Sequence, residues 1–146
     1  PEPVEFVNVV HSSLPYRLMA HTAEDLCECF LTQEELDSCN HGDVHHGFLL
    51  SFPEKEPDLN LEEIEQKVQE MIAQDIPIDY VDESHILIGG KMHDCTGPRT
   101  HVRSTGKIQG FRLLHHLVHD PYAQRYLLVG CVGEDSETYM HRLARL

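Results

Sequence analysis

The chain has 146 residues, of which 25 are acidic and 11 basic, so its formal net charge is −14 with the histidines neutral. This length predicts a single domain over residues 1–146, and 40% hydrophobic with 25% charged residues is a globular composition, neither disordered nor fibrous. No apolar run approaches the roughly 18 residues of a membrane span, and no secretory leader is recognisable. We therefore expect no membrane association and an intracellular location, cytoplasmic or nuclear.

The charge is unevenly distributed along the chain. Residues 1–73 contain 16 acids and three bases, whereas residues 91–125 contain six bases, two acids and five histidines. The negative net charge argues against nonspecific nucleic-acid binding by the whole surface, but it is compatible with a local anion site in the basic residues 91–125. The acidic part has two interpretations that stay open: solubility, or docking of a basic protein partner.

In chain order, the first predicted elements are a strand and two short helices. The β-branched and aromatic run at residues 4–10 predicts a strand. Thr22 and Thr32 each precede an acid by three residues, which is typical of a helix N-terminus. These signals predict helices over residues 23–30 and 33–39.

The middle of the chain gives the clearest local signals. The apolar run at residues 47–52 predicts a buried strand. Asn60 has the character of a helix cap, and apolar residues at helical spacing follow it, which predicts a helix over 61–73. Residues 76–81 and 85–91 predict two strands of a hairpin.

The last third contains one ambiguous segment. Glycines and a proline predict a long loop over residues 92–106, and residues 107–119 fit either a strand or a helix, with helix favoured. A strand over 125–132 and a helix beginning at Ser136 complete the chain. The predicted fold is α+β, a single compact domain with a mixed or antiparallel sheet of about five strands and about four helices.

The segment of residues 97–112 suggests an anion site. It combines arginine, lysine and hydroxyl side chains with glycines that let the main chain approach a ligand, and phosphate recognition uses this mixture. It matches neither the phosphate-binding GxxxxGK[ST] loop nor the GxGxxG dinucleotide fingerprint. Internal pairing of its arginines with the acidic half, or a solvated loop, are the alternatives. The candidate ligand-binding residues are Arg99, Arg103, Ser104, Thr105, Lys107 and Arg112.

Two histidines are candidates for acid–base catalysis beside a bound phosphate. His101 lies between Arg99 and Arg103, so an extended segment would project all three side chains to one face. Neighbouring guanidinium groups lower the proton affinity of an imidazole, which suits a general base or acid. His115 is the second candidate, and a surface position without a role is the alternative for both.

Three clusters offer ligands for a divalent metal ion. The first is zinc-like in composition, but a C-x-C pair on a helix points to different faces, so ordinary buried thiols are the favoured interpretation. The second is a turn-rich loop that combines imidazoles with a carboxylate. The first set is Cys27, Cys29, Cys39 and His41; the second is His41, Asp43, His45 and His46.

The third metal candidate consists of His115, His119 and Asp120. In a helix over residues 107–119, His115 and His119 would lie at i and i+4 on one face, as in helical two-histidine metal sites. Three functions are thus predicted as alternatives. The leading one is binding of a phosphate-bearing ligand, a nucleotide or RNA. The others are a non-enzymatic protein-interaction module and a hydrolase dependent on a divalent ion at the third cluster.

Overall fold

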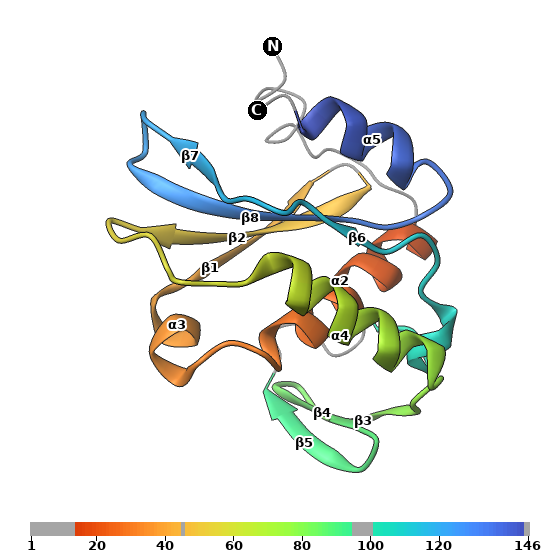
Figure 1. Cartoon of the computed structure of the whole chain (residues 1–146). Coiled ribbons are helices and arrows are strands. Elements are labelled where there is room, and N and C mark those ends of the chain that lie inside the picture. Colours follow the sequence, from red (N-terminus) through yellow and green to blue (C-terminus); the bar gives the residue numbers. More distant parts are fainter. Residues whose placement is uncertain (1–13, 45, 95–100, 145–146) are drawn as a thin grey trace.

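Two largely buried strands form the centre of the structure. β2 (Gly47–Pro53) pairs antiparallel with β8 (Arg125–Cys131) over its whole length, and both strands follow the apolar runs that predict them. The computed structural model in Figure 1 describes residues 14–44, 46–94 and 101–144, without the Asp43 side chain. The strand predicted at residues 4–10 lies outside the described residues.

The described strands form two antiparallel sheets. The larger has five strands in the order β1-β2-β8-β6, with β7 also paired to β8. The smaller sheet is the meander β3-β4-β5, which contains the predicted hairpin. The bounds of the remaining strands are β1 (Asn40–Val44), β3 (Ile78–Asp82), β4 (His85–Ile88), β5 (Lys91–Asp94), β6 (Arg112–Leu113) and β7 (Val118–Asp120).

Helices cover both faces of the five-stranded sheet. Figure 1 shows α2 and α4 on one face and α5 on the other. The small sheet lies beside the C-terminal end of α2. The helix bounds are α2 (Leu14–Glu28), α3 (Gln33–Ser38), α4 (Leu61–Ala73) and α5 (Ser136–Leu143). The α+β prediction is confirmed, with two antiparallel sheets where a single sheet was expected. None of the helices among the described residues has the length and apolar character needed to cross a bilayer.

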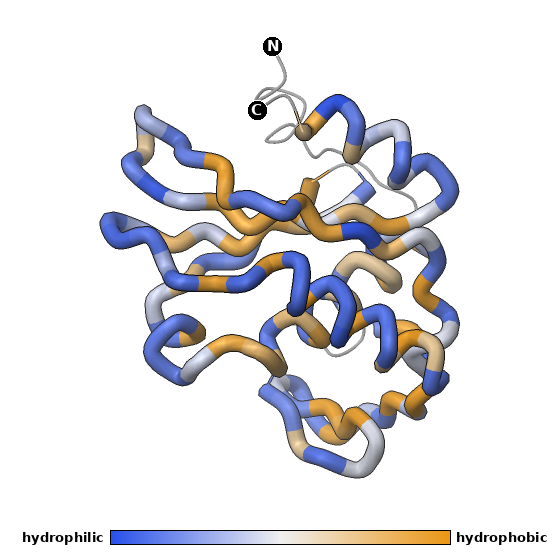
Figure 2. Tube along the Cα trace, in the orientation of Figure 1, coloured by the Kyte–Doolittle hydropathy of each residue, from blue (hydrophilic) through white to orange (hydrophobic). Residues whose placement is uncertain are grey.

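Alternation along the central strands divides the interior into two clusters. Phe48 and Leu50 of β2 pack toward α2 and α4, whereas Leu49 between them packs with Val129 and Met140 on the α5 side. Figure 2 shows the resulting hydrophobic stretches along β2 and β8. Because both faces are covered, these strands have almost continuous apolar sequences.

Local capping fixes two of the helices as predicted. The Asn60 side chain accepts a hydrogen bond from the Glu63 N–H at the start of α4, at 3.1 Å. Thr32 and Glu35 form a reciprocal capping box at the start of α3. Thr22, by contrast, does not begin a helix. It lies inside α2, where its hydroxyl donates to the Leu18 carbonyl at 2.7 Å, so this helix starts earlier than predicted.

The helix favoured over residues 107–119 is wrong. The region instead contains a short 3₁₀ turn at Thr105–Lys107, followed by β6 and β7, which both pair with β8. Leu113 and Leu114 are both buried but belong to opposite clusters, which an extended chain allows for neighbouring residues. The i, i+4 face proposed for His115 and His119 therefore does not form.

Phe48 supplies a test of this packing. Its ring is fully buried and occupies the space beside Gly130, where an added Cβ would collide with it. Phe48→Ala is expected to lower the free energy of unfolding by about 3–5 kcal/mol in urea denaturation. Tyr122→Ala, at a 98% exposed position, should change it by less than about 0.5 kcal/mol. Equal effects of the two substitutions would contradict the described core.

Candidate metal centre

The last turns of α2 bury three carboxylates. Glu24, Asp25 and Glu28 are each less than 9% exposed. Ala23 and Leu26 on the same helix pack into the main hydrophobic cluster, so acidic and apolar side chains of α2 are buried together. Carboxylates lose their hydration when buried and so require hydrogen bonds, protons or cations. Three buried carboxylates on adjacent turns therefore require several hydrogen-bond donors, protons or cations at this end of α2.

Histidines from three separate elements meet these carboxylates. His41 on β1 places Nδ1 3.1 Å from Glu24 Oε1 and Nε2 3.3 Å from Glu28 Oε2. His101, with a side chain only 4% exposed, places its Nε2 against Asp25 Oδ2 in a short hydrogen bond. Each of these imidazoles therefore has a defined carboxylate partner.

His93 on β5 is arranged differently. Its Nε2 lies 3.9 Å from Asp25 Oδ1 and 4.0 Å from Glu28 Oε1, both too long for a hydrogen bond. The atom is buried and has no hydrogen-bond partner among the described residues. Its other nitrogen, Nδ1, lies 3.9 Å from the Cys29 sulfur. With the proton on Nδ1, the lone pair of Nε2 is available between two carboxylate oxygens.

Apolar packing positions the segment that carries His93, and a hydrogen bond from the main chain positions the segment that carries His101. Ile86 and Ile88 of β4 join the main cluster and fix the small sheet against α2. The Val102 N–H donates to the Thr22 hydroxyl of α2 at 3.0 Å, which places the neighbouring His101 beside Asp25. The imidazoles are therefore positioned by secondary structure and main-chain contacts.

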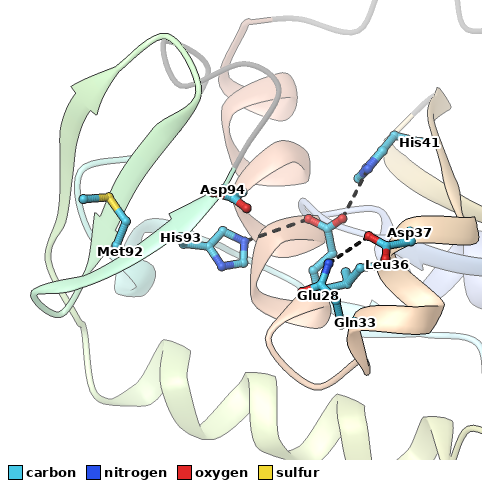
Figure 3. A pocket seen from close by; sticks show the side chains of 8 residues that line it. All are labelled: Glu28, Gln33, Leu36, Asp37, His41, Met92, His93 and Asp94. Carbon is cyan, nitrogen blue, oxygen red and sulfur yellow. Dashed lines mark hydrogen bonds and ion pairs between the residues drawn. The ribbon is translucent and has the colours of Figure 1, made fainter.

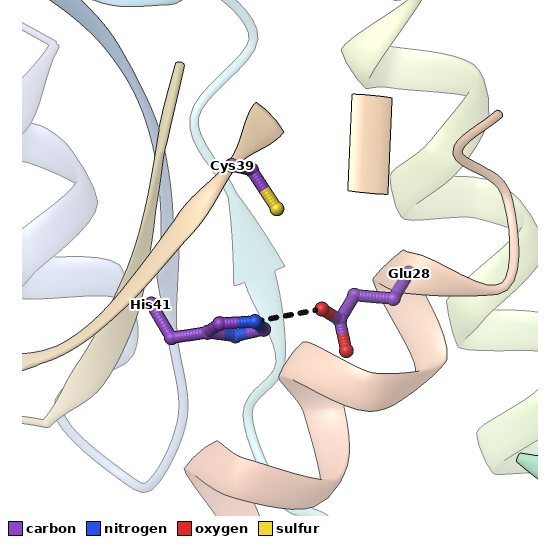
Figure 4. A group of neighbouring side chains, drawn as sticks. All are labelled: Glu28, Cys39 and His41. Atoms are coloured by element: carbon purple, nitrogen blue, oxygen red, sulfur yellow. Dashed lines mark ion pairs between the residues drawn. The ribbon is translucent and has the colours of Figure 1, made fainter. Parts of the chain in front are cut away.

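Two overlapping groups of metal-type ligands result. Site A consists of Asp25, Glu28 and His93; site B consists of Glu28, Cys39 and His41. Within each group the ligand atoms lie within 4.8 Å of one another. Figure 4 shows site B, with the Cys39 thiol and the His41 ring both on the side of β1 that faces Glu28.

An open pocket of about 400 Å³ reaches both sites. Glu28, His41 and His93 form part of its lining, together with Asp37, Met92 and Asp94. Figure 3 shows Glu28 between the two histidines, with an interaction to each. The ligand atoms are therefore next to a space that can admit a small molecule.

The electrostatics show that protons balance part of the negative charge. Burial, with a further contribution from Asp25, raises the pKa of Glu28 to about 9. The hydrogen bond to Glu24 raises the pKa of His41 to about 9. Burial also raises the pKa values of Cys29 and Cys39 to about 11. At neutral pH the site therefore holds protons on Glu28, on His41 and on both thiols, and metal ions compete with such protons.

The predicted anion-binding residues have several partners within the protein. Arg112 pairs with Glu65 of α4 and Glu137 of α5, and Glu65 also accepts the Leu113 N–H at 2.7 Å. Burial opposes the ionisation of Glu65, but these hydrogen bonds and one from His115 lower its pKa overall. The Arg112 side chain thereby links β6 to two helices.

The rest of the basic segment divides between the interior and the surface. The buried Thr105 hydroxyl donates to the Met71 carbonyl and accepts the Ile76 N–H, at 2.5 and 2.7 Å. The Ser104 side chain hydrogen-bonds to Asp75, whose pKa it lowers. Arg103 and Lys107 are exposed. Arg99 lies outside the described residues.

The three residues of the predicted C-terminal metal cluster do not come together. His115 pairs with Glu65 at 2.9 Å, and Asp120 pairs with Arg125 at 3.2 Å. The His119 ring lies against Tyr126, with 4.8 Å between centroids. The helical spacing that would have joined His115 and His119 is absent, because His119 lies in strand β7.

The sequence pointed to part of the candidate site and missed its centre. Cys39 and His41 belong to the zinc-like set for which ordinary buried thiols were the favoured interpretation, and the structure places them near Glu28 in site B. His101 was a catalytic candidate and lies beside Asp25. The three carboxylates and His93 were missed. The available signal was the position of three acids next to Ala23, Leu26 and Cys27 in the last turns of α2.

Comparison with known proteins adds no assignment. No protein-family model matches the sequence, and no characterised protein is significantly similar to it.

The buried charge predicts an unusual pH dependence of stability. In metal-free protein, folded Glu28 keeps its proton up to about pH 9, whereas the unfolded side chain loses it near 4.5, so the folded state binds more protons between these values. Its contribution to the free energy of unfolding therefore falls as pH rises through this window. His41 acts in the same direction from about 6.5 to about 9.

Glu28→Gln removes the first contribution because glutamine stays neutral. The variant should gain stability relative to the wild type as pH rises from about 4.5 to about 9, measured by chemical denaturation with a chelator present. Below about pH 6.5 the difference is free of the His41 contribution. A stability difference that does not change with pH would show that Glu28 titrates normally in the folded protein.

Proposed function

We propose that this protein is a metal-dependent enzyme of the hydrolytic class, with a divalent transition metal ion bound in site A. The observation that carries the proposal is the buried His93 Nε2, which faces Asp25 Oδ1 and Glu28 Oε1 without a hydrogen-bond partner among the described residues. Ligand atoms around a tetrahedral zinc ion lie about 3.4 Å apart. The separations of 3.9 and 4.0 Å require an adjustment of only about half an ångström.

The donor set indicates the kind of ion. One imidazole and two carboxylates suit Zn²⁺, Mn²⁺ or Fe²⁺, whereas Ca²⁺ and Mg²⁺ prefer oxygen ligands alone. His101 holds Asp25 through its second oxygen, in the manner of the outer groups that orient metal ligands. A cation also supplies the charge that three buried carboxylates need.

The pocket supports a catalytic role over a purely structural one. Structural zinc sites use four protein ligands, whereas catalytic sites use three and leave a position for water or substrate. Glu28 and His93 line the open pocket, so the remaining position faces it. An ion held in this way lowers the pKa of a bound water and makes it a nucleophile near neutral pH.

The pocket wall also limits the substrate. Asp37 and Asp94 add carboxylates to the lining, and Met92 adds an exposed apolar surface. A polyanion would be repelled here, so the proposed substrate is neutral or cationic. Anion binding by residues 97–112 and docking of a basic partner by the acidic half remain predictions from sequence.

Metal binding tests the proposal directly. Chelator-treated wild type should bind Zn²⁺ tightly in calorimetric titration, and His93→Ala should weaken binding at site A by more than about tenfold because it removes a ligand. His115→Ala is the matched control, since it removes a histidine that pairs with Glu65 and belongs to neither site. Absence of binding by the wild type to Zn²⁺, Mn²⁺, Fe²⁺ and Co²⁺ would contradict the proposal, as would unchanged binding by His93→Ala.

Access to the ion tests the catalytic part separately. The visible spectrum of the Co²⁺-loaded protein should change when acetohydroxamate, a small chelating ligand, is added, because the open coordination position faces the pocket. A spectrum insensitive to this ligand would indicate a closed structural site. That result would be consistent with metal binding but would contradict the proposed catalytic role.

A further inference from the structure

The two oxygens of Glu28 point toward different histidines. Oε2 lies 3.3 Å from His41 Nε2, and Oε1 lies 4.0 Å from His93 Nε2. Figure 3 shows the carboxyl group between the two rings, one from β1 and one from β5. This is the arrangement of a carboxylate that bridges two ions, which in two-metal sites lie about 3.5–4 Å apart.

We propose that site B binds a second divalent ion, so that Glu28 bridges a two-metal centre; this inference rests on the proposed occupation of site A. Cys39 and His41 complete the second ligand set, and all three ligand atoms lie within 4.8 Å of one another. A thiolate with an imidazole and a carboxylate is a donor set that suits Zn²⁺. Figure 4 shows the Cys39 sulfur, from the residue that precedes β1, and the His41 ring of β1 on the side that faces Glu28.

Glu24 provides independent support for the second ion. Its Oε1 accepts from His41 Nδ1 at 3.1 Å, which leaves His41 Nε2 as the ligand nitrogen, directed at Glu28. Carboxylates that hold the far nitrogen of a metal-bound histidine are a regular part of zinc sites. The Glu24 side chain is only 8% exposed, and its Oε2 has no hydrogen-bond partner among the described residues. A dication on His41 compensates this buried charge.

A second ion keeps the site electrically balanced. Two dications neutralise the three carboxylates Glu24, Asp25 and Glu28 together with a Cys39 thiolate. The second ion would take the place of the protons on His41 and on the Cys39 thiol, which balance the site when one ion is bound.

Zinc stoichiometry of the full chain decides between the possibilities. Native mass spectrometry and calorimetry on chelator-treated protein should give two Zn²⁺ per wild-type chain and one for Cys39→Ser or His41→Ala. Cys131→Ser and His115→Ala, a buried thiol and a carboxylate-paired histidine elsewhere, should keep two. Circular dichroism verifies the fold, and either of the two site B variants suffices if the other fails to fold.

Cobalt spectroscopy gives a second signature. Co²⁺ in site B should produce an intense near-ultraviolet thiolate charge-transfer band that Cys39→Ser removes, and the fully loaded protein should show spin coupling between the two ions.

The zinc stoichiometries of the variants distinguish failure of site B from failure of site A. One Zn²⁺ that depends on His93 but not on His41 or Cys39 overturns the second site and preserves the proposed function. One Zn²⁺ that depends on His41 but not on His93 overturns both the shared centre and the assignment to site A. No zinc at all overturns both proposals.

Discussion

The burial of three carboxylates at the end of α2 is the constraint on which the rest of the site depends. A helix that packs its apolar side chains into the core can expose its acids to water, yet Glu24, Asp25 and Glu28 are covered by other elements. Each covering element contributes a nitrogen: β1 provides His41, β5 provides His93, and the segment before the 3₁₀ turn provides His101. The small sheet thus meets the end of α2 through His93 as well as through apolar packing.

This arrangement costs stability in the absence of a cation. Buried carboxylates contribute little net stabilisation even when they are paired, and removal of a partner leaves an expensive isolated charge. Protons on Glu28 and His41 compensate part of the charge, and both groups have pKa values of about 9. Proteins retain such costly groups at functional sites, where stability is exchanged for binding or catalysis. Among the described residues, the buried Nε2 of His93 has no hydrogen-bond partner, although it lies near Asp25 and Glu28.

The fold was predictable where local signals decide the structure. The α4 helix begins at its Asn60 cap, and the two-sided burial of β2 is evident from its apolar run. Residues 107–119 were assigned wrongly because their strands form only by pairing with β8, a partner that local periodicity does not reveal. Non-local pairing was therefore the main source of error in the fold.

The site was only partly predictable for the same reason. Cys39 and His41 are neighbours in sequence, so their spacing was informative. Asp25 and His101 are separated by 76 positions and meet only when the chain folds. His93 lay in a predicted loop but belongs to β5, and this strand is what directs its ring toward α2. Three acids next to apolar residues in the last turns of α2 were the local sign of the centre.

The most direct test of the central claim is the position of the ion. Crystals grown with Zn²⁺ and measured at the zinc absorption edge should give an anomalous peak about 2.0–2.2 Å from His93 Nε2, Asp25 Oδ1 and Glu28 Oε1. The His93 ring should keep its present orientation, and the peak should face the pocket. Zinc bound only at other residues, or a His93 ring turned to donate directly to Asp25, would contradict it.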